Sequence, residues 1–197
     1  MRAPILLVTL FTLLVTTVAV VDAQNRRRSP RGAAATDIGG KWVEVEYGRP
    51  ILRGRTAIFG EGEDYGEKVG AGAPVWRLGA DKSTRLTTEH TLAIGGKTVA
   101  PGEYSLFVNL AGPADWELVV SNWGAQETFS RDDKENLWGS YGYTPDKDVV
   151  RADMIVSDVD MSVDQLTIGF INVTDEGGQL AVWWDDTMAT VDFTVVK

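Results

Sequence analysis

Apolar and polar residues alternate along short segments of this chain, and most of these segments end at glycine, proline or aspartate. The clearest case is residues 41–47, where Val43, Val45 and Tyr47 fall on one face. An alternation with a period of two predicts a half-buried β-strand. Pro50 ends this strand, because proline has no backbone N–H to donate to a neighbouring strand.

The same pattern predicts a series of further short strands. They cover residues 75–78, 84–94, 104–110, 116–121, 148–156, 165–173, 179–184 and 188–196. Gly95-Gly96 is typical of a two-residue hairpin and Pro101-Gly102 of a turn. Residues 174–178 and 185–187 are expected to be hairpin connections between the last strands.

Helical periodicity is weak beyond the first part of the chain. Residues 61–74 are expected to form an exposed loop, and residues 122–147 a mostly irregular segment with a short helix at 132–137. Many short strands separated by turns predict an all-β fold. We therefore expect a single antiparallel β-sandwich or jelly-roll-like domain that spans residues 37–197.

The chain begins with an apolar segment. Arg2 precedes an apolar run over residues 5–21, and small residues follow up to Ala23. This pattern predicts a signal helix in a signal peptide of residues 1–23, with cleavage after Ala23 and a periplasmic or secreted product. An uncleaved membrane anchor is the alternative, because a membrane span requires about 20 residues. The arginines at 26–28 argue against an anchor, since basic residues prefer the cytoplasmic side. After cleavage we expect no stable membrane insertion.

The charge distribution is uneven. Residues 24–36 are rich in arginine, contain Ser29-Pro30 and lack an apolar period, which predicts a flexible linker. From Asp37 onward the chain holds 14 basic and 27 acidic residues, a net charge of −13. Such a surface repels polyanions, so nucleic-acid binding by the domain is not expected.

The composition limits the chemistry that the chain can perform. The sequence has no cysteine and one histidine, His90, so disulfides, thiol nucleophiles and multi-histidine metal sites are excluded. His90 falls on the apolar face of a predicted strand, which favours a role in the core. No nucleophile elbow or phosphate-binding glycine loop is present. We expect no catalytic residue, no metal site and no cofactor.

Two groups of residues are candidates for ligand binding. Arg49, Arg55, Trp76 and Arg77 gather around the corner that follows the first strand. Guanidinium groups suit carboxylate or phosphate, and a tryptophan ring stacks on a ligand or on a guanidinium. The alternative is that these arginines pair with nearby carboxylates and lock the corner.

The second group is aromatic and belongs to the irregular segment. Its members are Trp123, Trp138, Tyr141 and Tyr143, which lie among polar residues, an arrangement that suits binding of sugars or of a protein surface. Of these, Trp138 and Tyr141 are the candidates for ligand binding, and the alternative is that these two rings cap an open end of the sandwich.

Several motifs of the chain resemble a family of bacterial exported proteins, domain-of-unknown-function family 2911. The resemblance rests on Tyr47-Gly48-Arg49-Pro50, Trp76-Arg77 with Gly79-Ala80, residues 101–107, Trp138-Gly139 and residues 148–151. The chain departs from the family pattern at Asp81-Lys82, where the family has Asn-Glu. The resemblance implies the fold and export, and no particular activity.

The functional expectation is an exported, non-catalytic binding or interaction module. Its ligand would be an anionic small molecule, a carbohydrate or a segment of an envelope protein, held at the arginine and tryptophan corner. One alternative is an envelope hydrolase or lyase that uses carboxylates in the same cleft, and another is a structural envelope protein without a ligand site. Guanidiniums that line a concave surface without carboxylate partners would support the first hypothesis.

Overall fold

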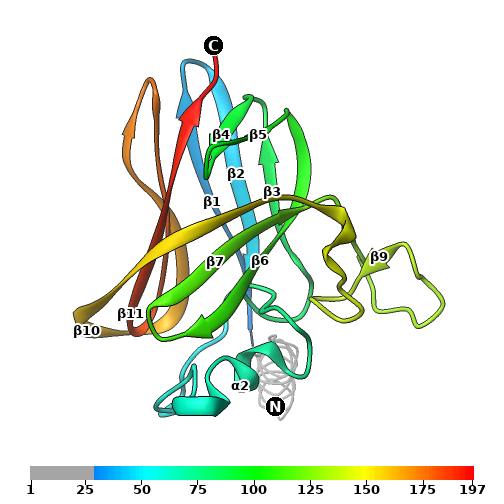
Figure 1. The fold of residues 1–197 in the computed structure, drawn as a ribbon, viewed down its shortest axis with the longest axis vertical. Helices are drawn as coiled ribbons and strands as arrows, with labels where there is room; N and C mark the ends of the chain where they lie inside the picture. The colour runs from blue at the N-terminus through cyan, green and yellow to red at the C-terminus, as the bar shows by residue number, and fades with distance from the viewer. Residues whose placement is uncertain (1–28) are drawn as a thin grey trace, which may run out of the picture.

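A computed structural model describes residues 29–197, which form one large antiparallel β-sheet and few helical turns (Figure 1). The all-β antiparallel fold predicted from the sequence is therefore confirmed. The predicted signal helix and its cleavage site lie outside the described residues. Within residues 29–197, no helix is long and apolar enough to cross a membrane.

The sheet contains nine strands, and two further short strands pair with each other in parallel. The strands are β1 (Arg31–Ile38), β2 (Lys41–Gly48), β3 (Thr84–Thr88), β4 (Leu92–Ile94), β5 (Lys97–Val99), β6 (Gly102–Gly112), β7 (Asp115–Ser121), β8 (Gly124–Ala125), β9 (Asn136–Leu137), β10 (Asp148–Thr174) and β11 (Gly177–Val195). The helical turns are η1 (Gly62–Asp64), α2 (Glu67–Gly70) and η2 (Pro145–Lys147).

The nine strands follow the order β1-β2-β3-β6-β7-β10-β11-β4-β5. This order has two parts, β1-β2-β3-β6-β7 and β11-β4-β5, and β10 joins them. Its residues 148–154 pair with β7, and its residues 155–174 pair with β11. In Figure 1, β10 crosses the view from the right and turns upward at the left into the hairpin with β11. The predicted sandwich is thus one continuous sheet that folds over at β10.

One hydrophobic core fills the space between the two parts of the sheet. It takes alternating residues from both parts, such as Val43 and Leu118 on one side and Ile168 and Val182 on the other. The period of two in the sequence predicted these inward faces, because successive side chains of a strand point to opposite sides. Trp184 is buried and its neighbour Trp183 is half-buried, as expected for adjacent residues of a strand.

The corner after β2 packs backbone against backbone. A Cβ atom on Gly48 would lie 2.0 Å from the carbonyl oxygen of Ala80, and one on Gly79 would lie 2.8 Å from the carbonyl oxygen of Gly48. Only glycine allows this close approach. The two segments, 47–50 and 76–80, therefore meet in space although about thirty residues separate them in the sequence.

Tyr47 and Arg49 tie β2 to the other half of the sheet. The Tyr47 hydroxyl donates to the carbonyl oxygen of Ile168 (3.3 Å) and accepts from its backbone N–H (2.8 Å). Nε of Arg49 donates to the carbonyl oxygen of Leu166 (3.3 Å), and its side chain crosses β1 above Gly32. These bonds hold β10 beside β1 and β2.

Several boundaries differ from those predicted. Residues 31–36, part of the expected linker, form β1 and pair with β2. The strand predicted at 84–94 is two strands, β3 and β4, which lie in different halves of the sheet. The strand predicted at 75–78 reduces to one bridge between Trp76 and Val108.

The last part of the chain also differs. Residues 148–173 were expected to contain two strands, and residues 185–187 a hairpin connection, but β10 and β11 run through both. The pairing of β10 with β11 is irregular near Val163 and Asp185, and this irregularity accommodates the polar residues of the two strands. The short helix predicted at 132–137 is wrong, since Asn136–Leu137 forms β9.

Candidate functional site

Arg55, Trp76 and Arg77, three of the predicted site residues, line one cavity of about 670 Å³. We call it the arginine cavity. Lys68, Asp81 and Trp184 also line it. These residues come from the segment after β2, from α2, from the segment before β3 and from β11, so the cavity exists only in the folded chain.

Arg55 lies at the exposed side of the arginine cavity. Its Nε and Nη2 donate to the carbonyl oxygens of Leu52 (2.9 Å) and Ile51 (2.8 Å), and its Cζ lies 5.8 Å from the ring centre of Trp184. The two carbonyl oxygens and the ring hold the guanidinium in place without cancelling its charge.

Trp76 lies beneath the cavity and belongs to the core. It is 2% exposed, stacks on Trp184 at 6.1 Å between ring centres, and meets Phe59 edge to face at 5.6 Å. Its role is therefore to support the cavity. The Nε1 of Trp184 is buried and has no hydrogen-bond partner among residues 29–197.

Arg77 is half-buried and lines the cavity wall. Its Nη1 donates to the backbone oxygen of Asp81 (3.3 Å). Burial lowers the pKa of Arg77, and the nearby charge of Asp81 partly opposes this shift. A guanidinium carries several donors in a planar fork, and this hydrogen bond uses only one of them.

Gly139 lets Arg77 occupy this position. A Cβ atom on Gly139 would lie 2.5 Å from Nη1 of Arg77, and the residue has a φ of +65°, which favours glycine. The buried hydroxyl of Ser83 contacts the carbonyl oxygens of Gly139 (2.6 Å) and Leu137 (3.2 Å). This hydroxyl fixes the Trp138-Gly139 motif beside the Trp76-Arg77 motif.

Trp138 and Tyr141 line a second cavity, of about 640 Å³, on the other side of Arg77. We call it the aromatic cavity, and Arg77 lines it as well. Phe129 completes its aromatic wall, with its ring centre 6.1 Å from that of Trp138. Phe129 and Tyr141 are 50% and 75% exposed. Arg131 and Lys134 add positive charge to the same wall.

A single buried glutamine orders the loop that carries this wall. Nε2 of Gln126 contacts the carbonyl oxygens of Ser130 (3.1 Å), Asp133 (3.3 Å) and Asn136 (2.9 Å), and its Oε1 accepts from the backbone of Ser130. In Figure 1 this loop projects beside β9 at the right of the view. The loop is held from inside although it lies at the surface.

Asp133 also serves the loop. Its carboxylate accepts from the backbone N–H groups of Glu135 and Asn136 and from the side-chain amide of Asn136, each at 3.0 Å. The hydrogen bond from the Asn136 side chain, followed by the backbone bonds, lowers the pKa of Asp133.

Arg49, the remaining predicted site residue, does not line either cavity. It bonds to the backbone of Leu166 and weakly to the hydroxyl of Thr167. Among residues 29–197, none of Arg49, Arg55 and Arg77 forms an ion pair with a carboxylate. The corner is therefore locked by glycines, a tyrosine and one arginine, and the other two arginines remain at a concave surface.

The two cavities carry a positive charge on an acidic protein. Their cationic side chains are Arg55, Lys68, Arg77, Arg131 and Lys134, and their acidic ones are Asp81 and Asp133, a balance of +3. The residues at 81–82, where the chain departs from the family pattern, have separate roles. Asp81 accepts from Arg77 through its backbone, and Lys82 forms an ion pair with Glu127.

Sequence reasoning missed Lys68, Phe129, Arg131, Lys134 and Trp184 as residues of this surface. Each belongs to a segment expected to be loop or core, and each reaches the cavities through contacts between distant parts of the chain. The high share of aromatic residues in the irregular segment was a signal available for Phe129 alone.

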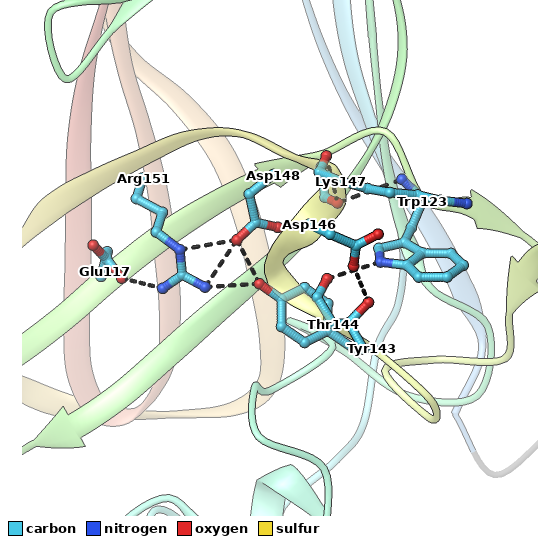
Figure 2. A network of polar contacts seen from close by, with 9 residues as sticks. Glu117, Trp123, Tyr143, Thr144, Asp146, Lys147, Asp148 and Arg151 are labelled. Carbon is cyan, nitrogen blue, oxygen red and sulfur yellow. Dashed lines mark hydrogen bonds and ion pairs between the residues drawn. The ribbon is translucent and has the colours of Figure 1, made fainter.

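A separate polar network joins the end of the irregular segment to the sheet (Figure 2). Arg151 of β10 bonds to Asp148 (2.9 Å), to Glu117 of β7 (2.6 Å) and to the hydroxyl of Tyr143 (2.7 Å). The Tyr143 hydroxyl donates to the same oxygen of Asp148 at 2.6 Å. Beside it, Lys147 lies 3.6 Å from the ring centre of Trp123.

This network shifts two pKa values. Burial, and then the hydrogen bond to Asp148, raise the pKa of Tyr143. Burial alone lowers the pKa of Arg151, but its bonds to Glu117 and Asp148 outweigh burial and raise it. Because every charged member has an opposite or polar partner, the network anchors the segment 122–147 to the sheet.

Within residues 29–197, no group of three or more His, Asp or Glu residues is placed to hold a metal ion. His90 is half-buried and its Nε2 lies 2.8 Å from the carbonyl oxygen of Ile38, which links β1 to the segment before β4.

The fold and site define a class: an antiparallel all-β protein with a basic, aromatic-walled concave surface. The chain belongs to the family of proteins of unknown function DUF2911, whose family model matches residues 29–193. The match includes β1, in agreement with its pairing in the sheet. Neither the curated proteins nor the solved structures gave a significant match.

Proposed function

We propose that the protein is an exported binding module without catalytic activity, and that its arginine cavity takes an anionic ligand. Export is proposed from the signal-peptide pattern of residues 1–23. A protein purified from the culture medium or periplasm with the mass of a chain that starts at Gln24 would agree with export. A mass that still includes Met1 would contradict it.

One observation carries the proposal for the ligand. Arg77 is half-buried at the cavity wall, its pKa is lowered by burial, and its hydrogen bond goes to a backbone carbonyl instead of a carboxylate. A partly desolvated guanidinium gains most from an oxyanion that accepts two parallel hydrogen bonds. Arg55 and Lys68 place further positive charge on the same wall.

The size of the cavity agrees with this role. Its volume of about 670 Å³ falls within the range of about 300–1,000 Å³ that is common for small-molecule sites. The stacked rings of Trp76 and Trp184 supply a rigid apolar surface below the arginines. A rigid surface lowers the entropy lost when a ligand binds.

In the aromatic cavity, binding is favoured over hydrolysis by the state of Asp133. A general acid at neutral pH requires a carboxyl group with a raised pKa. Asp133 instead accepts three hydrogen bonds within its own loop, and its pKa is lowered. It acts as an ionised structural acceptor.

Calorimetric titration with glucuronate, citrate and inorganic phosphate tests the proposal. At least one of these anions should bind saturably to the wild-type protein and at least tenfold more weakly to Arg77→Ala. Lys97→Ala is the control, since Lys97 is an exposed cation of β5 outside both cavities. If none of the three anions binds, or if Arg77→Ala binds as tightly as the wild type, the proposal is wrong.

A further inference from the structure

We infer that the two cavities form one extended site, joined at Arg77, and that its ligand is an acidic oligosaccharide. The carboxylate of one sugar unit binds Arg77 and Arg55 in the arginine cavity. A neighbouring sugar ring packs against the wall of Phe129, Trp138 and Tyr141 in the aromatic cavity. This inference rests on the proposed function and names its ligand class.

The continuity of the site depends on Arg77. It is a lining residue of both cavities, and its guanidinium lies against the backbone of Gly139 between the Trp76 and Trp138 motifs. Ser83 holds this backbone from the opposite side. A ligand that binds Arg77 from the arginine cavity therefore continues directly into the aromatic cavity.

The aromatic wall is suited to a sugar ring. Phe129 and Tyr141 are 50% and 75% exposed, although aromatic side chains of this size are usually buried when they serve only the core. Phe129 and Trp138 meet at 65°, so that their faces form two sides of a corner. The C–H face of a sugar packs on such surfaces while its hydroxyl groups reach polar neighbours.

Polar and charged groups surround the aromatic wall in the way a sugar acid requires. Arg131 and Lys134 belong to the same loop. The carboxylate of Asp133, which lies between them in the sequence, accepts hydrogen bonds from the side chain of Asn136 and from the loop backbone. Two cations against one carboxylate on this wall favour an acidic saccharide over a neutral one. The net charge of −13 from Asp37 onward disfavours long polyanions such as nucleic acid.

The wall is organised before any ligand binds. Gln126 is 6% exposed and connects Ser130, Asp133 and Asn136, so the loop has an internal frame. A loop held in this way loses little conformational entropy on binding, which raises affinity for a weakly interacting ligand such as a sugar.

The test compares three oligomers and one monomer by calorimetry. Galacturonate probes the arginine cavity alone, tetragalacturonate probes the extended site, cellotetraose removes the charge, and tetraglutamate keeps the charge on a peptide. Tetragalacturonate should bind the wild-type protein at least tenfold more tightly than each of the other three probes.

Variants separate the two cavities. Tyr141→Ala and Arg131→Ala should weaken tetragalacturonate binding three- to tenfold without changing galacturonate binding, whereas Arg77→Ala should weaken both. Trp42→Ala is the matched control, because Trp42 is a 52% exposed aromatic residue of β2 that lines neither cavity. Tyr141 and Arg131 are exposed, so both variants should keep the fold, and thermal unfolding of each variant verifies this.

Each result has a distinct meaning. Equal affinity for galacturonate and tetragalacturonate would overturn the extended site and leave the proposed function standing. Equal affinity for cellotetraose would overturn the acidic ligand class, and equal affinity for tetraglutamate would overturn the saccharide. If no acidic probe binds, the inference and the assignment of a sugar acid to the arginine cavity both fail.

Discussion

The guanidinium of Arg77 lies directly against the backbone of Gly139, so that a Cβ atom on Gly139 would be 2.5 Å from Nη1. The two residues are more than sixty positions apart in the chain. Each belongs to a tryptophan-containing motif, Trp76-Arg77 and Trp138-Gly139. Their contact explains why a glycine follows Trp138 and why Arg77 stands at the border of two cavities.

The first prediction concerns Gly139→Ala. The new methyl group displaces the guanidinium, and the positive φ adds strain of about 1–2 kcal/mol. Gly142→Ala is the matched control, because Gly142 has a φ of +82° but its Cβ would meet only Leu137, at 3.9 Å. Urea denaturation should show similar losses in the free energy of unfolding for both variants.

Only Gly139→Ala should move Arg77. The ¹H–¹⁵N signal of the Arg77 Nε group, identified by its loss in Arg77→Lys, should shift in Gly139→Ala and stay in place in Gly142→Ala. An unchanged signal in both variants would contradict the assigned contact.

The second prediction concerns Tyr47→Phe. This change removes a hydroxyl that bonds to both the N–H and the carbonyl oxygen of Ile168. Leaving buried backbone groups without partners should lower the free energy of unfolding by about 1–3 kcal/mol. Tyr104→Phe should lower it less, because the Tyr104 hydroxyl bonds only to the carbonyl oxygen of Ala100. Equal losses in the two variants would show that the two hydrogen bonds from Tyr47 to β10 add no more stability than the single hydrogen bond of Tyr104.

The third prediction separates a structural arginine from a binding one. Arg49→Met keeps the aliphatic stem above Gly32 but removes the bond to Leu166, so thermal unfolding should show a loss of about 1–2 kcal/mol. Arg55→Ala should change the free energy of unfolding by less than about 0.5 kcal/mol, because Arg55 is exposed and bonds only to local carbonyl oxygens. The affinity for anions should fall more in Arg55→Ala than in Arg49→Met. A larger loss of affinity in Arg49→Met would contradict the binding role of Arg55 and the structural role of Arg49.

The fourth prediction is a pH dependence that arises from Tyr143. Its pKa is raised above the ordinary value of 10.0 in the folded protein, so the folded state keeps the phenol proton after the unfolded state has lost it. Stability from this group is fully present below pH 10.0 and is lost as the pH rises further.

Tyr143→Phe lacks this contribution. The difference in free energy of unfolding between the wild type and Tyr143→Phe should therefore shrink as the pH rises from about 10 to about 12. Tyr65, whose pKa is raised mainly by burial, contributes equally to both proteins. Denaturant titrations across this range check the prediction, and a constant difference would contradict it.

Part of the fold could be read from local patterns. The alternation in residues 41–47 placed Val43, Val45 and Tyr47 in the core, and Gly95-Gly96 marked the turn between β4 and β5. Such signals are local, because the direction of a strand side chain depends on its position relative to its neighbours in the chain.

Other parts could not be read in this way. Residues 157–164 fell between two predicted strands, yet they continue β10. Val159, Met161 and Val163 alternate with polar residues there, and the register with β11 is irregular. Residues 31–36 lack an apolar face and suggested a linker, yet their backbone pairs with β2 residue by residue. Backbone pairing supplies the stability of β1, and it leaves no trace in side-chain hydrophobicity.

The sequence by itself determined the all-β class, the inward faces of the main strands and five residues of the concave surface, namely Arg55, Trp76, Arg77, Trp138 and Tyr141. Only the tertiary structure decided that Arg49 locks the sheet while Arg55 and Arg77 line a cavity, and that Lys68, Arg131 and Lys134 join them. The physical reason is that these positions depend on close backbone approach at Gly48, Gly79 and Gly139. Contacts of this kind join residues far apart in the chain, and no local periodicity encodes them.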